Sequence, residues 1–231
     1  MAKKQAKKSD QKKYWNGQHK EREKEHQALE GTPNDFAKKC LPYIKRGGKV
    51  LEIGVANGRD ARFFIRENDN RVVGVDISTE AIRQLLKAAA ANGTVDKILP
   101  VVADAQDVPK LLDDQEYYDA FYARSALHLD DDQIIPFLGY VVSHLNEDGV
   151  VLVQGKPKED FKLARSIEVG KNCYEDVDGH IRRAWSEEDI VALCRYLQLE
   201  IIEISHTTEL VLDKKTKFTH FIARKAKELR K

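Results

Sequence analysis

Glycine and acidic residues follow two hydrophobic runs in the first third of the chain, in positions suited to holding a nucleotide-like cofactor. The stretch 49–60 predicts a buried strand, a turn that contains Gly54 and Gly58, and the start of a helix. Glycine permits backbone angles closed to other residues and lets a ligand approach the main chain, while the first N–H groups of a helix lack partners. A purely structural turn is the alternative that this stretch alone leaves open.

The second run, 71–76, ends in Asp76, and Ser78 then starts an amphipathic helix that ends near Asn92 and Gly93. Asp76 follows Gly58 at close to the spacing of roughly 20 residues at which an acid reaches a ribose hydroxyl pair in doubly wound folds. A solvated acid at a strand end, or a partner for the following helix, is the alternative.

The kind of cofactor can be narrowed by testing the dinucleotide fingerprint G-x-G-x-x-G from Gly54 onward. The second and third glycines are replaced by Ala56 and Arg59, so the approach of a pyrophosphate is not provided for. The sequence also has no Tyr-x-x-x-Lys pair and no phosphate loop of the G-x-x-x-x-G-K-[ST] type. A cofactor without a pyrophosphate therefore fits better.

Three stretches, 50–58, 74–78 and 102–105, resemble the first three motifs of the class I S-adenosylmethionine-dependent methyltransferases. In that family the glycine turn holds the methionine half of the cofactor, the acid after the second strand binds both ribose hydroxyls, and the acid after the third strand meets the adenine amino group. The resemblance implies S-adenosylmethionine as the cofactor and the following cofactor-binding residues: Glu52, Gly54, Ala56 and Gly58 at the turn, Asp76 with Ile77 at the ribose, Asp104 with Ala105 at the adenine, and Ala123. The family's usual central glycine is Ala56 here, and because alanine restricts φ we expect ordinary backbone angles at this position.

The rest of the chain predicts further strands that alternate with helices. The expected strands are 98–104, 118–123, 150–153, 199–205 and 218–223, and the expected helices include 134–145, with an acidic start at 130–132, and one opened by Ser186. This alternation predicts an α/β fold with a mostly parallel sheet covered on both faces. The resemblance implies a Rossmann-like, doubly wound, seven-stranded sheet whose last two strands lie at one edge, the final one antiparallel.

Composition sets broader bounds on the chain. Its 231 residues, 42% hydrophobic content and net charge of +1 favour one soluble domain, with no apolar segment long enough to span a membrane. Three widely spaced cysteines suit a reducing cytoplasm, and no metal-ligand spacing stands out among the histidines. We expect a basic N-terminal tail and cover helix over 1–30, a methyltransferase domain over 31–226 and a basic tail over 227–231. The basic ends are either solvated, disordered tails or contacts for nucleic acid or another acidic surface.

The loop after the strand 118–123 borders the transferred methyl group in the resembled family. It lacks both the acid-or-asparagine, Pro-Pro, aromatic pattern of adenine and glutamine enzymes and the Pro-Cys of cytosine-C5 enzymes. His128 in this loop is the candidate general base, since its unperturbed pKa suits neutral pH, and a packing or capping role is the alternative. Arg124 is the candidate for binding a cofactor or substrate carboxylate.

Two further segments bear on the substrate. Tyr14 and Trp15 resemble the N-terminal aromatic pair that helps cover the cofactor in thiopurine- and tellurite-type methyltransferases, or else anchor an N-terminal helix. The segment 155–185 is polar, loop-like and of mixed charge, which predicts either a cover for a polar substrate or a solvated surface loop. The leading hypothesis is methyl transfer to a small polar molecule. A methyltransferase of RNA or protein and a non-catalytic cofactor-binding protein are the alternatives.

Overall fold

The computed structural model describes residues 2–24, 31–112, 115–163, 166–211 and 214–226. The chain divides into two units, Met1–Leu111 and Leu112–Lys231, and each is described by itself. In both units parallel strands alternate with helices, which confirms the predicted α/β class. None of the helices in these described ranges is long and apolar enough to cross a membrane.

The first unit contains three parallel strands in the order β3-β2-β1, which are β1 (Lys49–Ile53), β2 (Arg71–Asp76) and β3 (Ile98–Val102). Leu51 pairs with Val73 and Asp76 with Val102, so the carboxyl ends of the strands meet at one edge. The strands are connected by α4 (Arg59–Asn68) and α5 (Thr79–Ala91). Ser78 caps α5 by accepting a hydrogen bond from the backbone of Ala81, as the sequence predicted.

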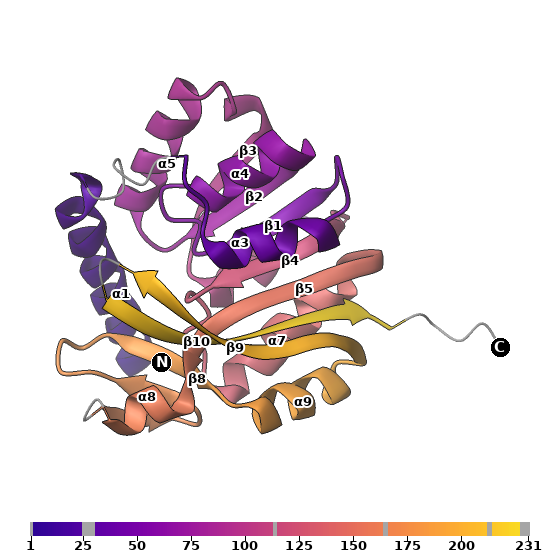
Figure 1. The fold of residues 1–231 in the computed structure, drawn as a ribbon. Coiled ribbons are helices and arrows are strands. Elements are labelled where there is room, and N and C mark those ends of the chain that lie inside the picture. Colours follow the sequence, from indigo (N-terminus) through magenta and orange to yellow (C-terminus); the bar gives the residue numbers. More distant parts are fainter. Residues whose placement is uncertain (1, 25–30, 113–114, 164–165, 212–213, 227–231) are drawn as a thin grey trace. The chain divides into compact units, whose positions relative to one another are not determined.

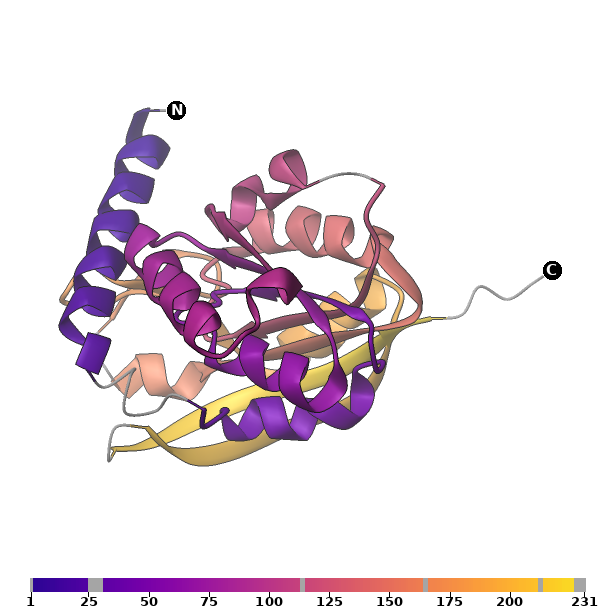
Figure 2. The same cartoon turned by 90° about the horizontal axis from the view of Figure 1, so that it is seen from above.

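Shorter elements complete this unit: α3 (Asp35–Cys40), η1 (Leu41–Tyr43), η2 (Val95–Lys97), η3 (Ala105–Asp107) and α6 (Val108–Leu111). At the N-terminus, α1 (Ala2–Glu21) lies beside α5, as two perpendicular views show (Figures 1 and 2). Residues 2–21, within the expected N-terminal tail and cover helix, are helical, so the alternative of a disordered tail does not apply to them. The predicted tail over 227–231 lies outside the described residues.

The second unit is built around β5 (Leu145–Pro157), whose neighbours are β4 (Tyr118–Arg124), parallel to it, and β10 (Lys214–Lys225), antiparallel to it. The helix α7 (Asp131–Ser143) connects β4 to β5 and begins with a capping box formed by Asp130 and Gln133. The helix α9 (Glu187–Tyr196) begins at Ser186, whose hydroxyl accepts from the backbone of Asp189. Both helix starts agree with the sequence prediction.

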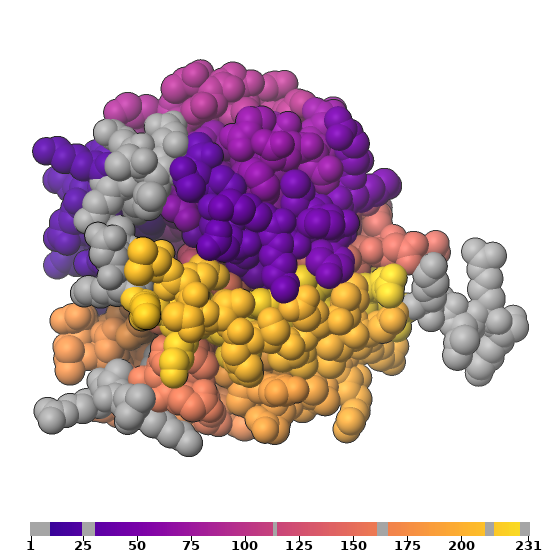
Figure 3. Space-filling view, in the orientation of Figure 1, coloured from indigo at the N-terminus to yellow at the C-terminus, as the bar shows by residue number. Residues whose placement is uncertain are grey.

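The last two strands are longer than predicted, and their order is β5-β10-β9, with β9 (Leu199–Val211) at the edge of the described sheet. The final strand is antiparallel to β5, as expected. The outer face of the β9–β10 hairpin is open in the space-filling view (Figure 3). Ile202 and Leu210 of β9 are exposed.

The segment 155–185 contradicts the expected loop. It contains α8 (Lys158–Leu163), β6 (Ile167–Gly170), β7 (Cys173–Glu175) and β8 (Ile181–Trp185). β7 pairs with both β6 and β8, and β8 joins the end of β5 through Lys156 and Pro157. The expected set of seven strands is thus extended by three in the part of the chain that the structure describes. These strands were not predicted because their charged residues indicated an exposed loop. Arg183 in β8 is in fact only 4% exposed, and its charge is neutralised by Asp131.

Candidate functional site

The turn after β1 is fixed to the end of β2 by backbone hydrogen bonds, since the N–H groups of Gly54 and Val55 both donate to the carbonyl of Val75, at 2.7 and 3.1 Å. Gly54 and Gly58 have φ values of 75° and 73°, in the left-handed region. A Cβ at Gly58 would lie 2.1 Å from Cδ1 of Leu85. The two glycines are therefore required by conformation, and Gly58 also by packing.

Ala56 corrects a prediction, because its φ is 50° and not an ordinary value. Its backbone N–H donates to Oδ2 of Asp76 at 3.0 Å. The direction of this N–H fixes the backbone angles of the turn, so alanine here takes a conformation that glycine adopts more readily. The family's usual glycine at this position is consistent with that geometry.

Asp76 lies at the centre of this edge. Asp76 is 8% exposed, and backbone N–H groups donate to both of its oxygens, that of Ala56 to Oδ2 and that of Ser78 to Oδ1 at 2.9 Å, with a further contribution from the backbone of Ile77. Burial raises the pKa of Asp76 to about 6, although these backbone hydrogen bonds act to lower it. A carboxylate oxygen has two acceptor positions, so each oxygen retains capacity for a hydroxyl donor, and the pair fits a vicinal diol.

Glu52 on β1 is 3% exposed, and its Oε2 atom is buried with no hydrogen-bond partner among the described residues. Burial raises the pKa of Glu52 well above its ordinary value, and the carboxylates of Asp60 and Asp76 raise it further, against the effect of Arg62. A buried acid without a donor is suited to a ligand that brings one, such as an ammonium group. This orphaned oxygen and the diol-sized acceptor pair at Asp76 fit the methionine and ribose parts of S-adenosylmethionine.

Asp104 follows β3 and caps η3 by accepting from the backbone of Gln106 at 2.9 Å. The N–H of Ala103 donates to the carbonyl of Asp76 at 2.9 Å, and this hydrogen bond connects the carboxyl ends of β2 and β3. Ile77 follows Asp76 directly, and Ala105 is the first residue of η3. The first unit therefore brings its predicted cofactor residues to one edge of the sheet. Ala123 belongs to the second unit, where it is buried in β4 opposite Val153.

His128 lies in the loop between β4 and α7, with its ring perpendicular to that of His180 at a centroid distance of 5.2 Å. Burial, together with the charges of His180 and Arg182, lowers the pKa of His128 to about 3. The expectation of a pKa near neutrality is therefore wrong, because the loop encloses the ring and cations lie close to it. His128 is a neutral imidazole at physiological pH.

Arg124 ends β4 and forms an ion pair with Glu209 of β9, with Nη2 and Oε2 separated by 2.8 Å. Gln154 on β5 donates to the other oxygen of Glu209 at 2.7 Å. The guanidinium also lies over the ring of Phe218, 4.9 Å from its centroid. Arg124, which the sequence predicted to bind a carboxylate of the cofactor or substrate, is thus already paired with the carboxylate of Glu209.

Several polar residues of the second unit were not predicted from the sequence. Asp176 organises the turn between β7 and β8: its side chain accepts from the backbone of Asp178 and His180 and pairs with Arg182 at 2.9 Å. Lys156 lies 5.0 Å from the centroid of the Phe218 ring. The turn between β7 and β8 brings His180 and Arg182 near His128, and the register of β10 on β5 brings Lys156 near Arg124. No local sequence motif predicts these contacts.

The aromatic pair Tyr14 and Trp15 lies in α1, with ring centroids 5.4 Å apart in a T-shaped arrangement. Trp15 also lies 5.9 Å from the ring of His19. Since α1 packs on α5, the alternative of an anchored N-terminal helix has structural support. Among the described residues there is no group of three or more histidine, cysteine, aspartate or glutamate side chains that could hold a metal ion.

Comparison with known proteins finds one matching family model and several similar folds. Residues 50–149 match the family model described as "Methyltransferase domain". An S-adenosylmethionine-dependent methyltransferase from Methanosarcina mazei is 19% identical in sequence, with a TM-score of 0.65, over 81% of this chain and 96% of that one. TehB from Haemophilus influenzae is 16% identical, with a TM-score of 0.63, over 84% of this chain and 62% of that one.

A third similar structure is the 1,6-didemethyltoxoflavin-N1-methyltransferase of Burkholderia thailandensis, solved with its substrate and S-adenosylhomocysteine. It is 17% identical, with a TM-score of 0.61, over 84% of this chain and 79% of that one. At these identities the likeness concerns the fold, whereas the family model matches the segment that holds the glycine turn, Asp76 and Asp104. Residues 50–149 of this chain therefore match a methyltransferase domain model, and the fold is that of S-adenosylmethionine-dependent methyltransferases.

Proposed function

We propose that the chain transfers the methyl group of S-adenosylmethionine to a small polar molecule. The observation that supports this acceptor is the enclosure of polar side chains in the second unit: Gln154 is 2% exposed, and the side chains of Glu209 and Arg124 are 10% and 17% exposed. Buried, mutually paired polar groups favour recognition of a compact polar ligand, whereas binding to RNA requires an open basic face. The toxoflavin-type relative, whose acceptor is a small molecule, adds support.

Each residue of the first unit has a distinct task in this proposal. Asp76 accepts hydrogen bonds from both ribose hydroxyls, Glu52 pairs with the ammonium group, and Asp104 accepts from the adenine amino group. Gly54, Ala56 and Gly58 bring the backbone close to the methionine part. The bound cofactor supplies a methyl group made electrophilic by its positively charged sulfur.

Rate enhancement in such a displacement comes mainly from holding the nucleophile in line with the methyl group, which contributes on the order of 7–11 kcal/mol for well-oriented reactants. An acceptor hydroxyl or ammonium must also lose a proton, and we assign its removal to His128. The imidazole is neutral, so it is in the form that accepts a proton. Its low pKa makes it a weak base, which suits an acceptor whose own proton is acidic.

We also infer a cytoplasmic location. Cys40, Cys173 and Cys194 are all buried and free of disulfide bonds. Free thiols of this kind are usual in a reducing compartment.

The test begins with calorimetric titration of the purified chain with S-adenosylmethionine and, separately, with NAD. We expect S-adenosylmethionine to bind and NAD not to bind. Asp76→Asn should weaken binding, whereas Asp96→Asn, which changes an exposed acid on η2, should not. Absence of S-adenosylmethionine binding would contradict the proposal at its first step.

The acceptor is tested next, with labelled cofactor, on a panel of small polar nucleophiles and on total RNA and protein. Label found in a small molecule supports the proposal. Label found only in a polymer favours the alternative of an RNA or protein methyltransferase, and removal of residues 227–231 then tests whether the basic C-terminus contributes.

A further inference from the structure

We propose that docking of α1 on α5 is coupled to cofactor binding, and that Asn16 is the positioning residue that couples them. This inference rests on the cofactor site of the proposed function and concerns its regulation. All the residues involved belong to the first unit. The path runs from Asn16 through Ser78 to the carboxylate of Asp76.

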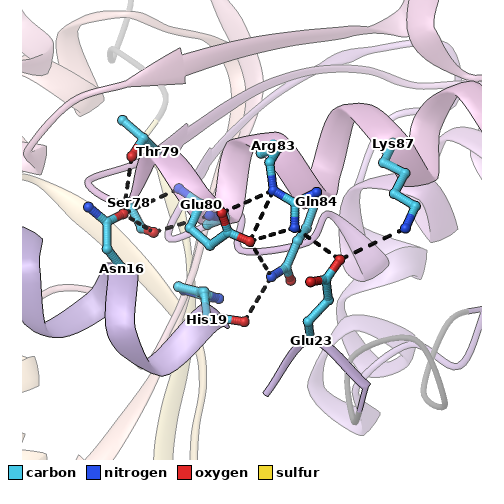
Figure 4. Close-up of polar contacts among 10 residues, drawn as sticks. Asn16, His19, Glu23, Ser78, Thr79, Glu80, Arg83, Gln84 and Lys87 are labelled. Atoms are coloured by element: carbon cyan, nitrogen blue, oxygen red, sulfur yellow. Dashed lines mark hydrogen bonds and ion pairs between the residues drawn. The ribbon is translucent and has the colours of Figure 1, made fainter. Parts of the chain in front are cut away.

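The side chain of Asn16 on α1 caps the N-terminus of the neighbouring helix α5 (Figure 4). Its Oδ1 atom accepts hydrogen bonds from the hydroxyl of Ser78 at 2.8 Å, the hydroxyl of Thr79 at 3.2 Å and the backbone N–H of Glu80 at 3.2 Å. The first N–H groups of a helix have no partner within it, and that end carries partial positive charge. One amide oxygen of α1 therefore gathers three donors at the start of α5.

Ser78 is the residue shared by α1 and the cofactor site. It is fully buried, and its hydroxyl donates to Asn16 while accepting from the backbone N–H of Ala81 at 3.1 Å. Its backbone N–H donates to Oδ1 of Asp76 at 2.9 Å. The hydrogen bond to Asn16 fixes the hydroxyl of Ser78, and with it the backbone that holds the ribose-binding carboxylate in place.

Further contacts of α5 with α1 and with Glu23, just beyond the end of α1, are of two kinds. Gln84 donates to the backbone carbonyl of His19 at 2.8 Å, and both residues are buried. Farther out, Glu23 pairs with Arg83 at 2.9 Å and lies 3.9 Å from Lys87, where both cations are at least half exposed. Exposed ion pairs contribute little to stability, so the buried hydrogen bonds are expected to determine docking.

Coupling between two sites is reciprocal. If docked α1 favours the conformation of Asp76 that binds the cofactor, bound cofactor favours docked α1 by the same factor. The predicted sign is positive: the cofactor protects α1, and disruption of Asn16 weakens cofactor binding. Bound cofactor also slows amide exchange that proceeds through global unfolding, so the coupling is measured on α1 amides that exchange by local opening. For those amides, a helix that merely stabilised the fold would show no dependence of its protection on the cofactor.

The experiment uses the full chain and two readouts: calorimetric affinity for S-adenosylmethionine, and amide hydrogen exchange in α1 with and without it. In the wild type we expect the cofactor to slow exchange in α1. Asn16→Leu, which removes the acceptor, should weaken cofactor binding about tenfold, equivalent to about 1.4 kcal/mol, and abolish the cofactor-dependent protection.

Two variants serve as controls. Asn16→Asp keeps an acceptor oxygen in the same place, next to the positive end of α5, and should retain both affinity and protection. Glu23→Gln removes only the outer ion pairs and should also behave as the wild type. If Asn16→Leu does not fold, Asn16→Gln displaces the acceptor by one methylene and carries the same expectation as the leucine variant.

The outcomes separate this inference from the proposed function. A wild-type chain that does not bind S-adenosylmethionine contradicts both. A wild-type chain that binds it, with unchanged affinity and unchanged protection in Asn16→Leu, contradicts the coupling alone. Weakened binding in Glu23→Gln equal to that in Asn16→Leu would likewise overturn the role of Asn16.

Discussion

Ala56 donates its backbone N–H to Asp76 at 3.0 Å, and this contact joins the turn after β1 to the acid at the end of β2. The two residues belong to different motifs of the sequence. Their hydrogen bond means that the shape of the turn and the position of the ribose-binding carboxylate are not independent. A substitution at either residue is expected to affect the other.

The φ of 50° at Ala56 leads to the first prediction. A left-handed conformation costs an L-residue roughly 1–2 kcal/mol, whereas replacing alanine by glycine costs about 0.4–1 kcal/mol through the unfolded chain. Ala56→Gly should therefore leave the free energy of unfolding unchanged or raise it slightly. The matched control is Ala88→Gly, which makes the same change at a half-buried position inside α5 and should destabilise by about 1 kcal/mol. Equal losses in the two variants, measured by denaturant unfolding, would show that Ala56 is unstrained.

The second prediction separates conformation from packing at two glycines of positive φ. Gly58 has a φ of 73°, and a Cβ there would meet Leu85 at 2.1 Å, whereas Gly93 has a φ of 65° and open space around its Cα. Gly58→Ala should destabilise the chain by about 1–3 kcal/mol more than Gly93→Ala, because only the first inserts a methyl group into a packed site. Denaturant unfolding of both variants measures the difference in the free energy of unfolding. Similar losses in the two variants would mean that backbone strain alone causes the destabilisation.

The third prediction concerns the pH dependence of cofactor binding. The pKa of Asp76 is raised to about 6, and the ionised carboxylate is the better acceptor for ribose hydroxyls. Affinity for S-adenosylmethionine should therefore rise as the pH rises through 6 and level off above it. The cofactor's own α-carboxyl and α-amino groups titrate at about 3.5 and 8, outside the range between pH 5 and 7. Calorimetry across that range should give a steeper slope for the wild type than for Asp76→Asn, in which the raised pKa of Glu52 still contributes. A flat wild-type profile would contradict the role of Asp76.

The fourth prediction concerns His128. With its pKa near 3, the imidazole is in its neutral, proton-accepting form throughout pH 5–8. His128→Asn should lower kcat by at least ~10-fold, within the usual range for a lost general base, and leave the cofactor dissociation constant unchanged. Because His128 does not titrate near pH 6.5, the kcat of the wild type should not fall as the pH is lowered through 6.5. The pH profiles of the wild type and the variant should therefore have the same shape in that range. An unchanged kcat with the true acceptor would assign His128 to packing.

The fifth prediction concerns the ion pair of Arg124 and Glu209, whose side chains are 17% and 10% exposed. Removal of one partner leaves a largely buried charge, so Glu209→Met and Arg124→Met should each destabilise by about 2–3 kcal/mol. The double variant should be less destabilised than the sum of the two. A double-mutant cycle by denaturant unfolding measures this coupling. Additive losses would mean that the two charges do not stabilise one another.

Local patterns of the sequence predicted the elements of the first unit well. The hydrophobic runs that contain Glu52, end in Asp76 and precede Asp104 correspond to β1, β2 and β3, and Ser78 caps α5 as expected. These features depend on residues close together in the chain. The conformation of Ala56 was missed because it is set by a hydrogen bond to a residue on another strand.

The second unit shows where sequence patterns are insufficient. The strands β6–β8 were missed because Arg183 is buried in β8 through its pair with Asp131, so charge there does not indicate exposure. The partner of Arg124 was missed for a different reason. Glu209 reaches it only through the register of β9 on β10 and of β10 on β5, which a single sequence does not reveal.

The position of β10 has a consequence for folding during synthesis. Residues 219–224 pair with residues 150–155, which come about 70 residues earlier in the sequence, so β10 is an inner strand between β5 and β9. The second unit can acquire its complete sheet only after residues 219–224 have left the ribosome, and β5 lacks this neighbour until then. Such pairing between distant segments slows folding. A nascent chain stalled before residue 219 is expected to hold a folded first unit beside an incomplete second one.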